Sequence, residues 1–306
     1  MTVWEDIQAA VAQAHADYDT LGSNVTDLSK LLVGARADAE ILRARLTETQ
    51  TDLEHALAEI AVLQAELMAK DWSLVYSTTF AVDDGWTRPN EVQKNDASRN
   101  LPRNVTFGPD GLRIVGRRED AGTGTGLRHF TSGEALGRHV TVPNYFRAEV
   151  VGRGPHARGL WPCVLWFRPL NSPDGEIDLV ENFGAQPNVK ATLHNQYGAG
   201  HKMIGRTLPW ERVGDPAGDH TYVIEKTPGR IVVTVDGLVL MDVTGADAPD
   251  GFDWARIFET PDRTWYPRVT LQVGVGASGG ATGMPADDFT ETDMVVTSLR
   301  VWSATS

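Results

Sequence analysis

The chain of 306 residues contains a single cysteine, Cys163. It therefore forms no intramolecular disulfide and holds no metal ion through several thiolates. Basic residues are also scarce, 28 against 41 acidic ones, which gives a net charge of −13. Because nucleic-acid binding relies on basic side chains that displace phosphate counterions, this balance argues against a nucleic-acid partner. No run of about 18 apolar residues occurs, so we predict no membrane span.

Proline is absent from residues 1–70, although the chain has 16, and this segment holds only two glycines, Gly22 and Gly34. Because both residue types destabilise helices, their scarcity favours one long helix. Apolar residues recur there at alternating spacings of three and four. One series is Trp4, Val11, Tyr18, Val25, Leu32, Ala39, Leu46, Leu53, Ile60 and Leu67. The other is Ile7, Ala14, Leu21, Leu28, Ala35, Leu42, Thr49, Ala56 and Leu63.

A strict seven-residue repeat of this length is typical of a coiled coil, because a lone surface helix drifts off the period within a few turns. The helix would be on the order of 95 Å long at ~1.5 Å per residue. An alternative is a helical hairpin within one chain, for which Gly34 is the only candidate turn. We predict that residues 1–70 form an oligomerisation stalk and that residues 4–67 join copies of the chain. The mixture of leucine and β-branched residues in both series favours a trimer over a dimer.

Residues 71–306 contain all the prolines and short runs of β-branched and aromatic residues separated by turn signals. The clearest signal is Asp236-Gly237 between the apolar runs 230–235 and 238–242, which predicts a β-hairpin. No sustained helical period follows residue 70, and no repeat of about 20–50 residues is visible. We therefore predict an all-β domain, a β-sandwich of the jelly-roll type.

Three acidic residues stand close together in one predicted strand, at Glu176, Asp178 and Glu181. Glu176 and Asp178 are two residues apart, so both side chains point to one face while Ile177 and Leu179 point to the other. Glu181 has the wrong parity for a regular strand. A single β-bulge at Leu179 or Val180 would bring all three carboxylates to the same face, and bulges are frequent beside active sites.

Three carboxylates on one face repel one another, so they point to a function rather than to stability. Retaining glycosidases use one carboxylate as the nucleophile and another, ~5–5.5 Å away, as the acid and base. Asp178 lies between the other two acids, where it can hydrogen-bond the nucleophile and tune the titration of the group. Two other interpretations stay open on spacing alone: a solvated outer strand face and a calcium site.

The segment EIDLVE at 176–181 resembles the signature of glycoside hydrolase family 16, in the bulged form of its laminarinase-like and agarase-like branches. Further similar segments, in matching order, are GLWP at 159–162, DHTY at 219–222, VDG at 235–237 and LRVW at 299–302. The resemblance covers 71–306 and implies a concanavalin-like jelly roll with a sugar cleft on its concave face. It also implies that Glu176 is the nucleophile, Asp178 its assistant and Glu181 the acid/base.

Aromatic residues and one histidine are candidates for binding the sugar. Trp161 and Trp166, and also Trp210 and Trp265, present apolar rings on which a sugar could stack. Trp166 stands one residue later than the family's second tryptophan, which leaves open the face of the strand on which it lies. His194, on the next predicted strand, is expected to border the site. We therefore predict Trp161, Trp166 and His194 as substrate-binding residues.

Two other residues matter for the comparison with the family. Lys226 replaces a tryptophan that is common after the DHTY segment, and Cys163 is expected to be an inert thiol in the core. No cluster typical of a zinc site and no nucleotide-binding fingerprint is visible. We therefore predict no cofactor and no catalytic metal, while a structural calcium ion stays unassigned.

The combination of a long helical stalk with a sugar-active domain resembles phage minor tail or tail fibre proteins. Residues Met1–Asp6 lack the basic and apolar regions of a secretory signal, so we expect no signal peptide. We predict a retaining endo-β-glycosidase on a virion, which acts outside the cell on surface polysaccharide and contacts other tail proteins. The alternatives are a lectin-like receptor-binding protein without turnover and a purely structural trimeric spike.

Overall fold

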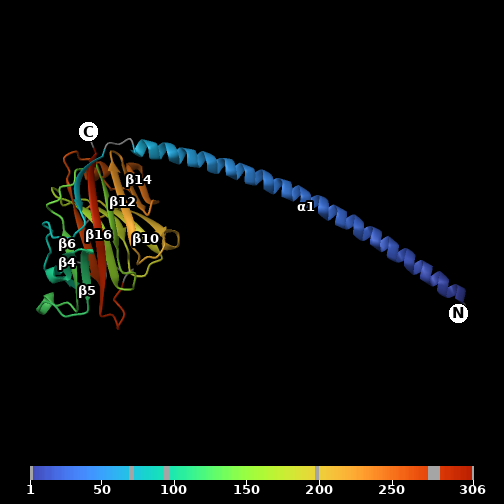
Figure 1. Cartoon of the computed structure of the whole chain (residues 1–306), viewed down its shortest axis with the longest axis horizontal. Helices are drawn as coiled ribbons and strands as arrows, with labels where there is room; N and C mark the ends of the chain where they lie inside the picture. The colour runs from blue at the N-terminus through green and yellow to red at the C-terminus, as the bar shows by residue number, and fades with distance from the viewer. Residues whose placement is uncertain (1–2, 69–71, 93–96, 197–199, 275–282, 305–306) are drawn as a thin grey trace. The chain divides into compact units, whose positions relative to one another are not determined.

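The computed structural model describes residues 3–68, 72–92, 97–196, 200–274 and 283–304. The chain divides into two units, Met1–Lys70 and Asp71–Ser306. The first unit contains α1 (Val3–Met68), one uninterrupted helix that runs through Gly34 (Figure 1). The predicted helix is thus confirmed, and the alternative of a helical hairpin is wrong, because the helix does not break at its only candidate turn.

The apolar side chains of α1 that the structure describes, those up to Leu53, are exposed within their own unit. The large ones whose side chains are described, from Trp4 to Leu53, are 49% to 76% exposed. An exposed apolar seam of this length is unfavourable in water unless another helix covers it. The coiled coil itself stays a prediction. Within the described residues, no helix is long and apolar enough to cross a membrane.

The second unit is an all-β structure with short helical turns between strands. Its outermost strands in sequence are β1 (Trp72–Thr78) and β16 (Glu291–Ala304), which pair with each other. Its helical segments are η1 (Pro102–Asn104), η2 (Gly124–Gly126), α2 (Trp210–Val213), η3 (Gly245–Asp247) and α3 (Trp254–Phe258). The remaining strands are β2 (Glu91–Val92), β3 (Ser98–Asn100), β4 (Val105–Gly108), β5 (Gly111–Arg117), β6 (Phe130–Leu136), β7 (Phe146–Arg153), β8 (Leu160–Pro169), β9 (Glu176–Glu181), β10 (Asn188–His194), β11 (Met203–Pro209), β12 (His220–Thr227), β13 (Arg230–Val235), β14 (Leu238–Thr244) and β15 (Trp265–Val273).

The strands form two layers that are joined between β6 and β5. One layer has the order β11-β10-β9-β8-β15-β6, and the other has the order β5-β16-β7-β12-β13-β14. Contacts of β12 with β9 and of β7 with β8 show that the layers pack face to face. The core lies between them and includes Ile177 and Leu179 from β9 and Tyr222 and Ile224 from β12. The predicted β-sandwich is confirmed.

The predicted hairpin is also present. Strands β13 and β14 pair antiparallel, and only Asp236 and Gly237 connect them. Both residues have positive φ, 48° and 79°. A two-residue turn of this kind matches the twist of the strands, and aspartate followed by glycine adopts it at low cost.

Candidate active site

Strand β9 carries the three acidic residues and lies between β8 and β10. Three steps along β9, from Asp178 to Glu181, correspond to only two steps along β10, so β9 contains one extra residue. The β10 residues that face the acids in register are His194, Thr192 and Lys190. The predicted bulge is confirmed, and Glu176, Asp178 and Glu181 share one face. Ile177 and Leu179 are fully buried on the opposite, core face.

The three carboxylates are buried although they lie outside the hydrophobic core. Glu176, Asp178 and Glu181 are only 7%, 4% and 5% exposed. The guanidinium of Arg168 donates from Nη1 to Oε2 of Glu176 at 2.9 Å. The hydroxyl of Thr192 donates to Oε2 of Glu181. The interpretation as a solvated outer strand face is therefore wrong.

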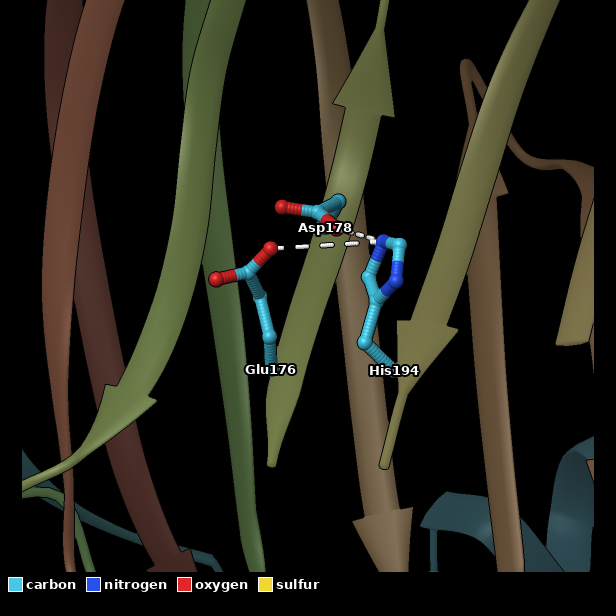
Figure 2. Close-up of side chains that lie close together, drawn as sticks. All are labelled: Glu176, Asp178 and His194. Atoms are coloured by element: carbon cyan, nitrogen blue, oxygen red, sulfur yellow. Dashed lines mark ion pairs between the residues drawn. The ribbon is translucent and has the colours of Figure 1, made fainter. Parts of the chain in front are cut away.

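His194 reaches across from β10 to two of the acids. Its Nε2 lies 3.2 Å from Oδ2 of Asp178 and 4.0 Å from Oε1 of Glu176. Figure 2 shows the three side chains converging on one point between the strands. The ring is 12% exposed, so the structure places His194 at the border of the acidic group.

Burial and mutual repulsion change the acidity of this group. Burial, and then the neighbouring charge of Asp178, raise the pKa of Glu181 to about 8, against the opposing hydrogen bond from Thr192. Burial and the charge of Glu176 raise the pKa of Asp178 well above its usual value. Glu181 can therefore hold a proton at neutral pH, as a general acid must.

The structure places both predicted tryptophan platforms on the carboxylate face. Trp166 pairs directly with Asp178 on β9 and with Arg268 on β15, and directly paired residues share a face. From Cys163 to Trp166, three steps along β8 correspond to only two steps along β15, so β8 also contains one extra residue. This bulge keeps Trp166 on the same face as Trp161 although the two residues are an odd number apart. Trp161 shares that face, opposite Gln272. The guanidinium of Arg268 lies 3.8 Å from the centroid of the Trp166 ring.

Two other tryptophans cannot serve as sugar platforms. Trp265 is fully buried on the core face of β15, and its Nε1 donates to Oδ1 of Asn144 at 3.1 Å. Trp210, at the start of α2, is only 4% exposed. The prediction that a sugar could stack on either ring is wrong, because their apolar faces are already covered by protein.

Sequence reasoning missed the surroundings of Cys163. The thiol is buried, as expected, but its residue pairs with Thr270 and lies on the carboxylate face rather than in the core. Burial, and then the charges of the three acids, raise the pKa of Cys163 well above its usual value. The thiol therefore stays protonated and unreactive, although it borders the site.

Arg168 and His201 were also missed. Arg168 follows an apolar run and gives no sequence signal of its partner. His201 lies on the loop after β10, and its Nε2 is 2.8 Å from Nδ1 of His194. The only sequence signal for it is its position seven residues after a histidine already predicted at the site.

A divalent cation could be held by oxygen atoms of Glu176 and Asp178 together with a ring nitrogen of His194. Among the described residues, these ligand atoms lie within 4.8 Å of one another. Such donors suit several divalent metals. The guanidinium of Arg168 already compensates the charge of Glu176, however, and would repel a cation bound there. The absence of a catalytic metal and of any cofactor stays a prediction.

Closely spaced carboxylates on one face of a sheet, beside aromatic rings, are typical of enzymes that cleave carbohydrates. The model of the glycosyl hydrolases family 16 matches residues 134–267. A β-glucanase of Rhodothermus marinus is 30% identical over 205 residues, which are 63% of this chain and 68% of that protein. The chain belongs to glycosyl hydrolase family 16, and it is a glycoside hydrolase.

Solved structures agree with this fold. An endo-β-1,3-glucanase from Pyrococcus furiosus is similar with a TM-score of 0.64 at 24% identity, over 78% of this chain and 96% of that one. The catalytic domain of an endo-1,3-β-glucanase (laminarinase) from Thermotoga petrophila is similar with a TM-score of 0.63 at 22% identity, over 78% and 100% of the two chains. At this identity the likeness supports the fold alone.

The raised pKa of Glu181 predicts an alkaline limit to activity. Glu181 is predicted to be the general acid, a role that requires its protonated form, so kcat/KM is expected to fall about tenfold per pH unit above a pKa of about 8. Initial rates from pH 5 to 10, measured on enzyme that is folded throughout, would show this fall of kcat/KM on the alkaline side of the pH profile. A fall of kcat/KM that begins near pH 5, or one that persists unchanged in Glu181→Gln, would contradict the role of Glu181 as the general acid.

Proposed function

We propose that the chain is a retaining endo-β-glucanase that cleaves β-1,3 or mixed β-1,3/1,4 glucans. The observation that carries this proposal is the buried set of Glu176, Asp178 and Glu181 on one bulged strand, with Arg168 on one acid and a raised pKa on another. The β-glucanase of Rhodothermus marinus supports the choice of a glucan. Membership of the family supports a polysaccharide as the substrate in general.

In the proposed mechanism, Glu176 attacks the anomeric carbon while Glu181 protonates the leaving oxygen. The bond to the leaving sugar breaks, and an ester forms between the substrate and Glu176. Glu181, now ionised, then takes a proton from water, which attacks the ester and releases a sugar of unchanged configuration. Arg168 compensates the charge of Glu176 before attack, and Trp166 and Trp161 offer their rings to neighbouring sugars.

Two measurements test this function. Release of reducing ends would be followed on laminarin, barley mixed-linkage glucan, cellulose, a β-galactan and bacterial envelope polysaccharide. Proton NMR of the first product would then identify the anomer that forms before mutarotation. We expect cleavage of the β-1,3-containing glucans and initial release of the β-anomer. Cleavage of the galactan alone would refute the glucan assignment, and an initial α-anomer would refute retention.

The two departures from the family pattern, at Trp166 and Lys226, would favour a lectin-like role without turnover only if they removed sugar-binding surface. Trp166, whose shifted position suggested a missing platform, lies on the carboxylate face. Lys226, which replaces a family tryptophan, is fully buried in the sandwich and does not alter the sugar-facing surface. Membership of a hydrolase family also opposes this alternative.

We also propose that α1 assembles several copies of the chain, with a trimer favoured, and that the assembly belongs to a phage tail. The exposed apolar seam from Trp4 to Leu53 supports the assembly. Joining several catalytic domains raises their effective concentration at a repetitive polymer. Detection of the chain by mass spectrometry in purified phage particles would test the location and the contact with other tail proteins. Its absence from such particles would refute both.

The oligomer can be tested on the full chain. Leu28→Asp combined with Leu32→Asp places two charges per chain on the seam, and we expect it to convert the trimer into monomers at micromolar concentration. Light scattering after size-exclusion chromatography measures the mass. Ala37→Asp, which lies off the seam, is the matched control and should leave the mass unchanged. A wild-type chain that is still a monomer at roughly 50–100 μM would refute the coiled coil.

A further inference from the structure

The carboxylate of Glu176 is held by a guanidinium group that is itself bonded at a second point. Nη1 of Arg168 donates to Oε2 of Glu176 at 2.9 Å, and Nη2 of the same group donates to the carbonyl of Pro173 at 3.0 Å. The other carboxylate oxygen lies toward His194, 4.0 Å from its Nε2 (Figure 2). Because a guanidinium is planar and rigid, bonds to two of its nitrogen atoms fix where it meets the carboxylate.

The loop directly before Glu176, residues 170–175, contains that second acceptor and lies beside the segment 256–264, which starts within α3 (Trp254–Phe258). Nδ2 of Asn171 in the loop donates to the carbonyl of Asp262 at 2.9 Å, across 91 residues of sequence. The shape of the loop is therefore set by a partner that is distant in the chain.

Two arginines of the segment 256–264 hold the far end of the loop. Arg263 is 6% exposed, and it donates from Nη1 to the carbonyl of Asp174 and from Nη2 to the carbonyl of Arg256, both at 2.8 Å. Nη1 of Arg256 lies 2.7 Å from Oδ2 of Asp174. A Cβ atom on Gly175 would stand 3.1 Å from Cγ2 of Ile257, so the backbone just before the proposed nucleophile also packs against α3.

The positive charge of Arg168 does not by itself account for this arrangement. A lysine would supply the same charge, whereas the guanidinium adds a fixed direction through its bond to Pro173. Direction matters for a nucleophile, since a displacement of about 1 Å can cost on the order of a hundredfold in rate. The bonds of the loop to the segment 256–264 extend this fixed direction to groups outside the active site.

We propose that Arg168 sets the direction of the Glu176 carboxylate, and that Arg256 and Arg263 are positioning residues that act on it through the loop 170–175. This inference rests on the proposed glycosidase mechanism, in which Glu176 attacks the anomeric carbon. In this scheme neither positioning residue contacts a reacting atom. Each holds the loop, the carbonyl of the loop holds the guanidinium, and the guanidinium holds the nucleophile.

Kinetics of the full chain separate direction from charge. Arg168→Lys keeps the charge but replaces the rigid fork with one flexible nitrogen, and we expect kcat on the glucan to fall about tenfold while KM changes less than about twofold. Arg256→Gln should lower kcat about threefold. Added to Arg168→Lys, it should have no further effect, because both changes act through one contact. Wild-type kcat in either single variant, or additive losses in the double variant, would overturn the proposal.

Arg230→Gln is the matched control for Arg256→Gln. The side chain of Arg230 is also 45% exposed and also lies 2.7 Å from a carboxylate oxygen, that of Asp242, but it belongs to the β13–β14 hairpin in the other layer. Because exposed ion pairs contribute little to stability, both variants should melt close to the wild type. Only Arg256→Gln should lose kcat. Equal losses of kcat in the two variants would overturn the proposal.

A structural measurement separates this inference from the proposed function. Crystal structures of the wild type and of Arg256→Gln, both without substrate, would show where the guanidinium of Arg168 lies. We expect Nη1 at a hydrogen-bonding distance of about 3 Å from Glu176 in the wild type, and this bond to be lost in the variant. That result would stand even if the wild type cleaved no glucan. An unchanged bond in Arg256→Gln would overturn the proposal, whatever the substrate.

Discussion

Replacing Glu176 with glutamine is expected to lower kcat on a glucan by on the order of 10⁴-fold, with little change in the melting temperature. The amide has the shape of the acid and can still accept the hydrogen bond from Arg168, which the wild-type carboxylate accepts at 2.9 Å. It cannot form the covalent ester. Steady-state rates on the glucan panel, with calorimetry of the same samples, measure both effects.

Azide gives a control that identifies each carboxylate by its product. In Glu176→Ala, azide can occupy the space of the nucleophile, and we expect it to restore cleavage of an activated aryl β-glucoside with formation of the α-azide. In Glu181→Ala, azide should instead attack the covalent intermediate and give the β-azide. The reverse pattern would exchange the roles of the two acids. No rescue, together with a fully active Glu176→Gln, would remove Glu176 from the mechanism.

Replacing Lys226 with methionine is expected to stabilise the protein at neutral and acidic pH. Lys226 is fully buried on the inward face of β12, and burial lowers its pKa from 10.5 to about 7. Its Nζ donates to Oδ1 of Asn144 and to the carbonyl of Phe258. Both acceptors keep another donor in the variant, since Trp265 bonds Asn144 and Nδ2 of Asn144 bonds Phe258. Methionine therefore leaves no buried acceptor unsatisfied.

The size and sign of this effect follow from the two pKa values. Between pH 7 and 10.5 the unfolded chain holds a proton on Lys226 that the folded chain has lost, so the contribution of this residue to stability rises with pH. Below about pH 7 the cost of the buried charge is fully present, on the order of 5 kcal/mol for a lowering of about 3.5 pKa units at about 1.4 kcal/mol per unit. The advantage of Lys226→Met should therefore be largest below pH 7 and shrink toward pH 10.5.

Urea unfolding at several pH values would measure the difference between wild type and Lys226→Met. Replacement of the exposed Lys202 by methionine controls for the loss of one positive charge. We expect the Lys202→Met difference to be small and flat with pH. A difference for Lys226→Met that does not change between pH 6 and 10 would show that the buried amine has an ordinary pKa in the folded protein.

Features with a local cause could be predicted from the sequence. The heptad spacing and the absence of proline predict α1, because a helix depends on residues three and four apart. Asp236-Gly237 predicts the hairpin for the same kind of reason, since a turn needs only its own residues. The bulge in β9 followed from parity alone: Glu181 can share a face with Glu176 only if one residue is extra, and the pairing with β10 shows that residue.

Other features depended on neighbours that are distant in the chain. Trp166 reaches the carboxylate face because of a register shift against β15, about a hundred residues later, and Trp265 faces the core of the same sandwich. The partners of Lys226 come from segments 82 and 32 residues away. His201 contacts His194 across seven residues of sequence, with its Nε2 2.8 Å from Nδ1 of His194. The sequence by itself determined which strand carries the acids, since side-chain alternation is a property of the strand. Which groups surround them was decided by strand order, register and burial, which exist only in the folded chain.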